Sequence, residues 1–388
     1  MSSPKKILVI GASIAGPAVC YWLKKFNFLP TLIERRPILS KGGYGIDARG
    51  IAVDVTKKMG IYDSILQQRT QIKSGCYVDA KGNILYESHG ETLGIRQGDE
   101  VEIIRGDLVE ILMELIHGTL PIYFHQSIHH IKQDADQVEV HFKNGDIQCF
   151  DLVIGADGLH STTREMAFDR DECELFNLNY YISVFSTPNF LHLDHSALLF
   201  EKDKKLTSIS SDRDPTKALT GFMFQSNHIL KDIRNEGEQK RFLYDLFHDL
   251  GWEVNTLLDF MEKSDDFYFD SMTQVKMKSY SKGRVALLGD AGYCASPLSG
   301  QGTSLALVGA YILAGELKRA QGDHEEAFHR YHQLLQPFVE ANQEFGAWVS
   351  QTFFASHDLV GTAAAERYDH LLERMETVTR AISLPEYD

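Results

Sequence analysis

The sequence is poor in cysteine and in positive charge. Five cysteines are scattered over 388 residues without Cys-x-x-Cys spacing, which argues against a disulfide framework and a zinc site and for reduced thiols in the cytoplasm. Lysine and arginine number 39 against 54 acidic residues, giving a formal charge of −15. Nucleic acid and anionic membrane surfaces are poor partners for such a chain. We therefore expect a small molecule as the partner, and no bound metal.

The sequence also has no internal repeats and no convincing membrane segment. An uncharged run from Ile7 to Leu23 follows Lys5 and Lys6, as in a signal peptide. However, the run contains glycines at turn positions, and Lys24 after it is typical of an exposed helix end. Hydrophobic residues make up 43% of the chain, enough for a substantial core. We expect a cytoplasmic monomer with no membrane insertion.

The most informative feature that is present is a glycine-rich turn after a buried strand. Lys6 to Ile10 lead into Gly11-Ala12-Ser13-Ile14-Ala15-Gly16, and Glu34 closes a second apolar run. In such a unit the first amides of the helix face a pyrophosphate, and the acid at the end of the next strand accepts the adenosine ribose hydroxyls. We therefore expect a dinucleotide site, with a helix over Pro17 to Phe26 and a strand over Pro30 to Ile33.

One residue of this motif departs from the usual pattern. Ser13 stands where the motif normally has its middle glycine, which lets the backbone approach a phosphate closely. The loop must then lie further from the phosphate, or the Ser13 hydroxyl must donate a hydrogen bond. Taken alone, an imperfect glycine turn is also compatible with an ordinary turn in any α/β protein.

Two more buried strands end in glycine turns. Asp151 to Ile154 lead into Gly155-Ala156-Asp157-Gly158, after which Ser161 is placed to cap a helix. Further along, Arg284 to Leu288 lead into Gly289-Asp290. Each turn is a weak indication by itself, but their order along the chain suggests that several segments meet one long cofactor.

Flavin adenine dinucleotide (FAD) is a cofactor of that length. It needs separate contacts for the adenosine, the ribityl chain and the flavin ring. We assign the adenosine to Gly11–Gly16 with Glu34, and the ribityl hydroxyls to Asp290. The amides of Gly300-Gln301-Gly302, at the positive end of a helix from Thr303 to about Ala320, are assigned to the flavin ring.

The rest of the chain has the composition of a sheet followed by helices. Strands rich in aromatic and β-branched residues are expected at Tyr180–Thr187, Ser196–Phe200, Leu206–Ser210 and Gly221–Gln225, with one helix at about Glu236–Leu250. Beyond Asp323 the pattern is helical to about Ile382, with breaks near Pro337 and around His357–Gly361.

These segments together resemble the class A flavoprotein aromatic hydroxylases, the single-component family that contains para-hydroxybenzoate hydroxylase. The matching positions are Gly11, Gly16 and Glu34 in the adenine-binding fingerprint, Arg105 as an arginine that reaches the flavin side chain, Asp157-Gly158, which in the family is implicated in flavin and nicotinamide binding, and Gly289-Asp290 with Pro297. Tyr293 and Thr303-Ser304 depart from the family's usual histidine and asparagine.

Within that family the chain is most similar to the tetracycline-inactivating monooxygenases, or tetracycline destructases. The similarity covers Gly42–Arg49, where Asp47 matches an aspartate that contacts the flavin, Thr220–Phe224 and Gly292–Gly302. It implies an α/β fold with a Rossmann-like (GR2-type) FAD-binding domain, an inserted antiparallel-sheet substrate domain and C-terminal bridging helices. The implied boundaries are 1–70, 100–172 and 275–320 for the FAD-binding domain, 71–99 and 173–274 for the substrate-binding domain, and 321–388 for the bridging helices.

The resemblance also implies a set of site residues. The cofactor-binding residues are Gly11, Ser13, Ile14, Ala15, Gly16, Glu34, Arg35, Asp47, Arg49, Arg105, Asp157, Gly289, Asp290, Pro297, Gly300, Gln301, Gly302 and Thr303. The substrate-contacting residues are Tyr181, Lys205, Gly221, Phe222, Met223 and Phe224. Because side chains alternate along a strand, only about half of the strand residues can face a cavity, and core packing is the alternative for the others. A solvated turn is the alternative for Lys205.

We make two predictions for the C-terminal helices. Trp348, Phe353 and Phe354 are expected to pack between helices. We hypothesise that the helix from about Thr362 to Ile382 gates the substrate entrance.

The activity implied by the resemblance is an FAD-dependent monooxygenase. It would use NADPH or NADH and O2 to oxygenate an enolised polycyclic or aromatic substrate through a flavin hydroperoxide, with tetracycline as the preferred substrate. No catalytic side chain is expected, because the flavin supplies the reactivity. The alternatives are an aromatic hydroxylase of another substrate, a flavin reductase or dehydrogenase without oxygen insertion, and a flavin-binding protein without activity.

Overall fold

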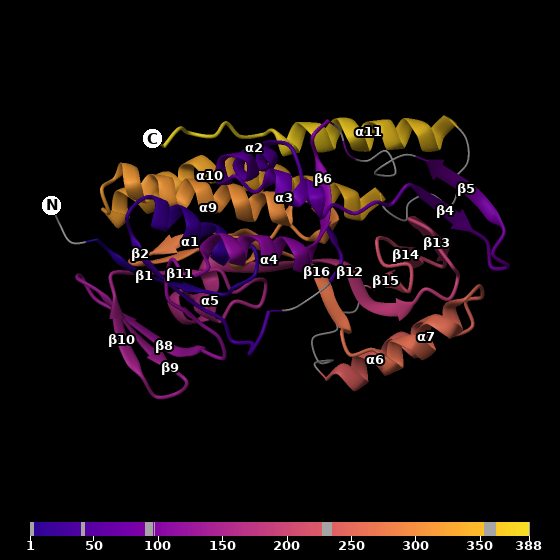
Figure 1. Ribbon diagram of the computed structural model, residues 1–388, viewed down its shortest axis with the longest axis horizontal. Helices are drawn as coiled ribbons and strands as arrows, with labels where there is room; N and C mark the ends of the chain where they lie inside the picture. The colour runs from indigo at the N-terminus through magenta and orange to yellow at the C-terminus, as the bar shows by residue number, and fades with distance from the viewer. Residues whose placement is uncertain are drawn as a thin grey trace.

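The computed structural model describes residues 4–39, 43–89, 96, 98–226, 235–352 and 362–387, the last range without the side chains of 362–369. Its architecture is mixed α/β, as expected, with a parallel-sheet body and a larger, mostly antiparallel sheet. In Figure 1 the parallel body lies on the left, the larger sheet on the right, and long C-terminal helices run along the upper side. Within these ranges no helix is long and apolar enough to cross a bilayer.

The parallel body is built on a six-stranded sheet. Its strands, in spatial order, are β17 (Ser281–Lys282), β18 (Val285–Leu287), β11 (Leu152–Gly155), β1 (Lys6–Ile10), β2 (Leu29–Ile33) and β7 (Ile122–Tyr123). Strands β18, β11, β1 and β2 run parallel, and the central residues of β18, β11 and β1 are fully buried, as expected where both faces of a sheet are covered. Helix α1 (Ala15–Lys25) connects β1 to β2, which gives the expected βαβ unit.

Helix α9 (Gly302–Arg319) is the central helix of this body, and every residue from Thr303 to Leu317 is buried. It packs against α1, α2 (Ile51–Met59) and α10 (His324–Thr352). The remaining elements of the body are β3 (Gly45–Ala48), α3 (Tyr62–Gln67), β6 (Val101–Ile104), α4 (Arg105–Ile116), β8 (Ile128–Gln133), β9 (Val138–Phe142), β10 (Ile147–Phe150), α5 (Thr162–Ala167), η1 (Arg170–Glu172), α8 (Asp290–Tyr293) and η2 (Pro297–Ser299).

The second sheet has seven strands. In spatial order they are β16 (Tyr268–Met277), β12 (Cys173–Pro188), β15 (Lys217–Gln225), β14 (Lys205–Ser211), β13 (Ser196–Lys202), β4 (Ser74–Val78) and β5 (Ile84–His89). Neighbouring strands are antiparallel except β13 and β4, which are parallel. The hairpin β4–β5 thus joins strands that follow it by more than a hundred residues in the chain.

The two faces of the seven-stranded sheet have different neighbours. One face packs on α6 (Glu236–Phe247) and α7 (Val254–Lys263) through a cluster that includes Phe185, Phe222 and Phe247. The other face contacts η2, α10 and α11 (Thr362–Thr379) through a cluster that includes Tyr180 and Leu298. Figure 1 shows α6 and α7 below the sheet and α11 above it.

The prediction of a helix break near Pro337 is wrong. Helix α10 is continuous from His324 to Thr352 with Pro337 inside it. Pro337 and Gln333, whose carbonyl loses its helical partner, are both exposed, so water can bond that carbonyl. Buried Leu335 and Phe338 on the opposite side keep the helix against the core. The other expected break, around His357–Gly361, lies outside the described residues.

The sequence predicted too few strands for the seven-stranded sheet and too few helices packed on it. The predicted strands were also too short. Strand β12 begins at Cys173 and not at Tyr180, because its first residues pair with β16. A second helix, α7, follows α6. Its buried residues, Val254, Leu257, Leu258 and Met261, have the spacing of a helix face, so this signal was present in the sequence.

After α11 the chain continues as a tail that is anchored by Tyr387. A Cβ on Gly315 of α9 would lie 2.1 Å from the Tyr387 ring, so the ring rests directly on this glycine. The Tyr387 hydroxyl donates to Glu316 Oε1 at 2.6 Å, and the Glu316 side chain has 0% exposure. Tyr311 donates to the Pro385 carbonyl at 2.8 Å. The tail is thereby tied to the central helix.

Replacing Gly315 with alanine should destabilise the protein by about 1–3 kcal/mol, because the new methyl group displaces the Tyr387 ring. In a chain that already carries Tyr387→Ala the clash is gone, and the better helix propensity of alanine should stabilise by up to about 1 kcal/mol. Chemical denaturation of the wild type, both single variants and the double variant measures both effects. Equal destabilisation in the two backgrounds would contradict this packing.

Candidate functional site

The predicted turns meet at one edge of the parallel sheet. Strands β1, β2, β11 and β18 are parallel, so their carboxyl ends, followed by the glycine turn, Glu34, Asp157 and Gly289-Asp290, lie at the same edge. Hydrogen bonds join the strand ends: Gly11 N–H donates to the Ile33 carbonyl at 2.8 Å, and Ala156 N–H donates to the Ile10 carbonyl at 2.8 Å. The turns, which are separated in the sequence, therefore lie side by side along this edge.

The glycine turn is shaped so that α1 begins right beside β1. Gly11 has φ +106°, and a Cβ on Gly16 would lie 1.8 Å from the Gly11 carbonyl oxygen. Ile14 and Ala15 begin the helix, and Ile14, at the N-cap, provides no side-chain cap. The first amides of α1 thus have no side-chain acceptor at the cap, which leaves the positive end of the helix for an anion.

Glu34 lies against this turn, as predicted. Its two carboxylate oxygens accept hydrogen bonds from the Ala12 and Arg36 backbone amides at 2.8 and 2.9 Å. The carboxylate is therefore held in a fixed position beside the glycine turn, with lone pairs left for ribose hydroxyls. The neighbouring Arg35 is exposed.

Arg105 is the first residue of α4 and reaches the glycine turn. Its Nη2 donates to Ser13 Oγ at 2.7 Å. The Ser13 hydroxyl thus accepts a hydrogen bond from Arg105, a contact that the sequence did not indicate. The Arg105 backbone amide donates to the Tyr44 carbonyl at 3.1 Å. Burial raises the pKa of Tyr44, and Arg105 acts in the opposite direction.

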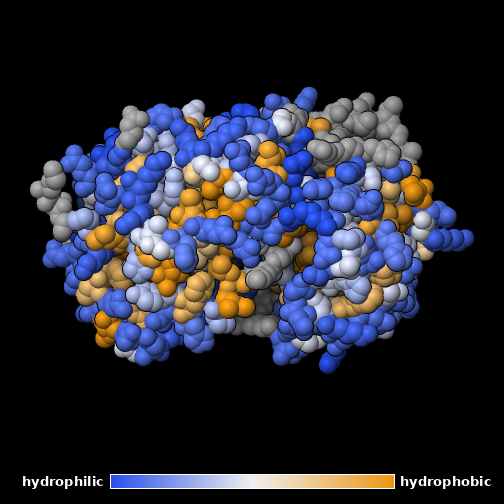
Figure 2. All heavy atoms as spheres, viewed as in Figure 1, coloured by the Kyte–Doolittle hydropathy of each residue, from blue (hydrophilic) through white to orange (hydrophobic). Residues whose placement is uncertain are grey.

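Asp290 begins α8, directly after Gly289. A Cβ on Gly289 would lie 3.2 Å from the Ala15 side chain, so this turn touches the start of α1. Asp290 keeps accessible surface, yet the surrounding protein is dense enough that burial raises the pKa of its carboxyl, while a hydrogen bond with Cys294 and the charge of Arg105 lower it. A side chain that is accessible and closely surrounded lies in a recess. Figure 2 shows that the face of the molecule in view is hollowed between its left and right halves.

The start of α9 faces Asp290. A Cβ on Gly302 would lie 3.9 Å from Asp290 Oδ1. The α9 N-cap, Gln301, provides no side-chain cap, and the first turn, which includes Thr303, has no acidic residue. Pro297 starts the short helix η2 before it, and Gly300 has φ +64° with open space around its missing Cβ. An uncapped helix end with free space beside it favours a group that bears negative charge.

Gln301 is the clearest sign that something belongs at this helix end. Its side chain has 0% exposure, and neither its Oε1 nor its Nε2 has a hydrogen-bond partner among the described residues. Buried amides are normally satisfied, so an unpartnered one points to a missing ligand atom or water.

Asp157 holds its own loop together. It accepts hydrogen bonds from the Ser161 hydroxyl at 2.5 Å and the Thr163 amide at 3.0 Å. Ser161 caps α5 as predicted. Arg164, 5% exposed, donates to the Leu159 carbonyl in this loop and to the Ala291 carbonyl beside Asp290, both at 2.7 Å. Arg164 thus bridges two of the motifs, a role that no local sequence pattern indicates.

Asp47 and Arg49 lie in a buried ion-pair network. Asp47 accepts from Arg49 at 2.8 Å and from Arg96 at 2.5 Å, and Arg49, 3% exposed, also lies 3.4 Å from Glu100. Arg49 Nη1 contacts Met375 of α11. Arg96 and Glu100 were not predicted, since only the folded chain brings them to Asp47. Gly42, in the same motif, lies outside the described residues.

The predicted substrate residues lie on opposite faces of the seven-stranded sheet. Tyr181, Phe222 and Phe224 belong to the cluster against α6 and α7, and Lys205, paired with Phe224, shares that face at the sheet's end. Met223 belongs to the cluster that contacts η2, α10 and α11, and Gly221, two residues away, shares its face. Only Gly221 and Met223 of these six therefore face the parallel body.

Further residues border the recess near Asp290. The rings of Tyr44 and Tyr268 lie 6.1 Å apart, and the Tyr268 hydroxyl donates to Asp270 Oδ2 at 3.2 Å. Asp270 influences the pKa values of Tyr44 and Asp290. Tyr268 and Asp270 belong to β16. Sequence reasoning missed them because nothing local indicates that this strand faces the motifs.

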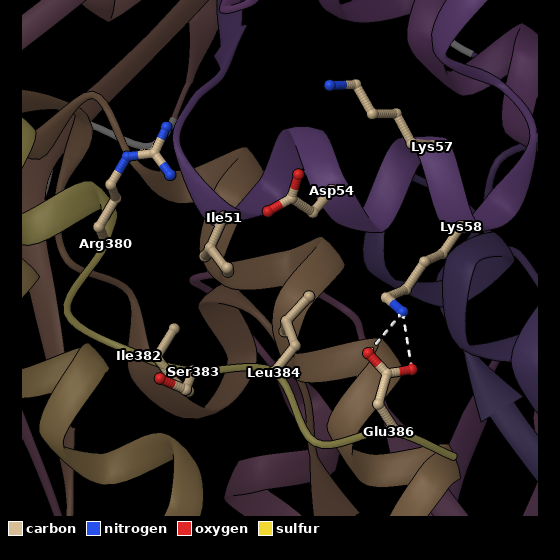
Figure 3. Close-up of a pocket in the computed structure, with 9 residues that line it drawn as sticks. All are labelled: Ile51, Asp54, Lys57, Lys58, Arg380, Ile382, Ser383, Leu384 and Glu386. Carbon is tan, nitrogen blue, oxygen red and sulfur yellow. Dashed lines mark hydrogen bonds and ion pairs between the residues drawn. The ribbon is translucent and has the colours of Figure 1, made fainter. Parts of the chain in front are cut away.

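A separate recess of about 630 Å³ opens between α2 and the C-terminal tail (Figure 3). It is lined by Ile51, Asp54, Lys57, Lys58, Arg380, Ile382, Ser383, Leu384 and Glu386. Figure 3 shows Lys58 paired with Glu386 across it, at 2.9 Å. None of the predicted site residues lines this recess. In the described part of the chain no group of three histidine, cysteine or acidic side chains is placed to hold a metal ion.

Comparisons with known proteins show the family and the fold of the chain. A family model described as an FAD binding domain matches residues 5–345. A flavin-dependent monooxygenase of Legionella longbeachae serogroup 1 is 54% identical over 388 residues, covering 100% of both chains. The crystal structure of tetracycline destructase Tet(51) is 54% identical, with a TM-score of 0.92 over 99% of this chain and 100% of that one. Tetracycline destructase Tet(55) is 56% identical, with a TM-score of 0.93 over 100% of both.

The matches span the parallel body and the seven-stranded sheet alike, so they concern the whole arrangement and not only the nucleotide turn. The cofactor is FAD, and the reaction type requires O2 and a nicotinamide reductant. The chain therefore belongs to the FAD-dependent monooxygenases.

Proposed function

We propose that this monooxygenase inactivates tetracycline antibiotics by inserting oxygen. The observation that supports this most is the full-length match to Tet(51) and Tet(55), at 54% and 56% identity, which includes the sheet that faces the cofactor edge. The match covers the seven-stranded sheet as well as the cofactor edge, so it is not confined to the nucleotide-binding part. The proposed partner is one tetracycline-like molecule, acted on by a monomer in the cytoplasm, where the free cysteines stay reduced.

We propose that FAD lies along the carboxyl edge of the parallel sheet. The uncapped start of α1 and Arg105 would hold the diphosphate, and Glu34 the adenosine ribose. Asp290 would bond ribityl hydroxyls, and the start of α9 would face the flavin ring, with Gln301 as a bonding partner. The residues fit such a cofactor because the glycines leave room and the buried amide lacks a partner. Residues 1–70, 100–172 and 275–320 would form this cofactor-binding part.

When bound and reduced by the nicotinamide donor, FAD would supply the activation of O2, from which the inserted oxygen atom comes. The protein's part is to hold the substrate carbon near the flavin and to exclude water. We assign the substrate to the sheet face that carries Gly221 and Met223, because η2, which precedes the flavin-facing start of α9, packs against that face. Residues 71–99 and 173–274 would form this substrate-binding part, and 321–388 the helices that close it.

Helices α10 and α11 are joined at Trp348. The Trp348 ring lies 5.4 Å from the His370 ring, and Arg374 lies over it at 4.6 Å. Trp348 thus packs between helices, as predicted; Phe353 and Phe354 lie outside the described residues. The gate assigned to the helix after Thr362 stays a proposal. It is supported by the contact of Met375 with Arg49, which links α11 to the Asp47 network.

The polar pair His160–Asp270 joins the loop after Asp157 to strand β16 of the seven-stranded sheet. His160 lies 3.1 Å from Asp270 Oδ2. The hydrogen bond to Asp270 raises the pKa of His160. The His160–Asp270 pair therefore links the loop after Asp157 to β16, and protonation of His160 strengthens this link.

Purified protein should bind FAD and oxidise NADPH or NADH faster when tetracycline is added. The tetracycline product should gain one oxygen atom, taken from labelled O2 in a mass-spectrometric assay. A simple phenol such as para-hydroxybenzoate serves as the control substrate and should not stimulate oxidation. Turnover of the phenol without turnover of tetracycline would overturn the substrate assignment and leave the enzyme class intact.

Adjacent residues of β15 should separate substrate binding from core packing. Met223→Ala should raise KM for tetracycline about 5- to 30-fold, the equivalent of removing one apolar contact, with little change in FAD content. Phe222→Ala, one residue away on the opposite face, should lower the stability by about 3–5 kcal/mol and leave KM nearly unchanged. Steady-state kinetics and chemical denaturation of both variants test this. If Phe222→Ala alone altered KM, the face assignment would be wrong.

The His160–Asp270 pair predicts a pH-dependent stability. Because folding raises the pKa of His160, its contribution is complete below about pH 6.5, the ordinary histidine value, and is lost as pH rises through the raised value. The wild type should exceed His160→Gln in stability at about pH 5.5 and equal it at about pH 8.5. The difference should stay below about 1 kcal/mol, since the His160 side chain is 71% exposed.

The control for this measurement is Asp270→Asn, which keeps the shape of the partner and removes its charge. It should show the same loss of the low-pH advantage. A pH-independent difference between the wild type and His160→Gln would mean that the histidine contributes by packing alone.

A further inference from the structure

We propose that Ser13 is a positioning residue that holds Arg105 at the phosphate-binding end of α1. Ser13 occupies the place of the middle glycine in the nucleotide turn, and its hydroxyl accepts a hydrogen bond from Arg105 Nη2 at 2.7 Å. The proposal rests on the assignment of FAD to this edge and is independent of the identity of the substrate.

The backbone of the turn accommodates a side chain at this position. Gly11 has φ +106°, whereas Ser13 is not among the residues with positive φ. Ser13 is only half-buried, so its side chain has room beside the turn. The turn therefore needs glycine at positions 11 and 16 but has no conformational need for it at 13, and the serine adds a polar contact without strain.

The Arg105 side chain is positioned from both ends. At its base, the Arg105 amide bonds the Tyr44 carbonyl at 3.1 Å, and the Arg105 Cβ lies 3.6 Å from where a Cβ on Gly43 would be. At its tip, the guanidinium is held by Ser13, the residue just before the α1 N-cap. The charge of Arg105 is thus placed next to the free amides of the first turn of α1, where two positive sources act on one anion.

The contact with Ser13 leaves the arginine available to a phosphate. An arginine has five N–H donors, and the contact with Ser13 uses one of them. Arg105 can therefore bind a diphosphate oxygen while Ser13 holds it in place, and holding a long, flexible side chain beforehand reduces the loss of freedom upon binding.

The test is a double-mutant cycle on FAD affinity, measured with apoprotein by the quenching of FAD fluorescence. Ser13→Ala should raise the Kd for FAD about 10-fold, as expected for a hydrogen bond to a charged group. Arg105→Ala should raise it further. In the Arg105→Ala background, Ser13→Ala should have almost no additional effect, because the hydroxyl acts through the arginine. Ser64→Ala, an exposed serine of α3, is the matched control and should leave the Kd unchanged.

Other variants keep the test decisive. Ser13→Gly should weaken FAD binding like Ser13→Ala, and Ser13→Thr, which retains the hydroxyl, should restore part of the affinity. If Arg105→Ala does not fold by circular dichroism, Arg105→Lys replaces it in the cycle, since lysine keeps the charge but lacks the fork that meets Ser13.

Specific results would overturn the proposal. They are an unchanged Kd in Ser13→Ala, tighter binding in Ser13→Gly, or an equal effect of Ser13→Ala with and without Arg105. The last result would mean that Ser13 bonds FAD directly. An unchanged Kd in Arg105→Ala would instead reject the location of FAD. None of these outcomes bears on the substrate, which the tetracycline assay of the wild-type protein tests separately.

Discussion

The parallel pairing of β1, β11 and β18 is the constraint on which the site depends. Each strand ends in a glycine turn, and parallel pairing brings the three ends to one edge. The tight contact of Gly16 with the Gly11 carbonyl then fixes where α1 starts. Because the strands are buried on both faces, a shift of register would expose apolar residues, so the alignment of the three turns is as stable as the core itself.

Helix α9 carries this alignment to the rest of the molecule. Its first turn faces Asp290, its middle packs on α1 and α10, and its last turns hold the C-terminal tail at Gly315 and Glu316. A helix buried along its length cannot move without repacking its neighbours. The tail, though distant in sequence and space from the flavin end, is therefore connected to it through a single rigid element.

How well a feature could be predicted depends on how far apart in the sequence its interacting residues lie. The nucleotide turn, the Ser161 cap and the start of α9 were predicted because strand, turn and helix signals lie within a few residues of each other. Alternation along β15 showed that about half its residues face a cavity, but which half depends on α6 and α7 packing beneath Phe222. Likewise, Asp270 reaches the recess only because β16 passes beside the cofactor edge. No local pattern in the sequence indicates this position of β16.

The charge of the site differs from that of the whole protein. The formal charge is −15, yet Arg105 and the free ends of α1 and α9 gather positive charge at the cofactor edge. Since the Debye length in physiological salt is about 8 Å, exposed acids beyond that range are largely screened, and local groups decide which ligand binds. Asp290 is the local exception, and burial raises the pKa of its carboxyl. A carboxyl with reduced tendency to ionise repels a nearby anion less and still bonds hydroxyl groups, so an acid at this place is compatible with the uncapped, positive starts of α1 and α9.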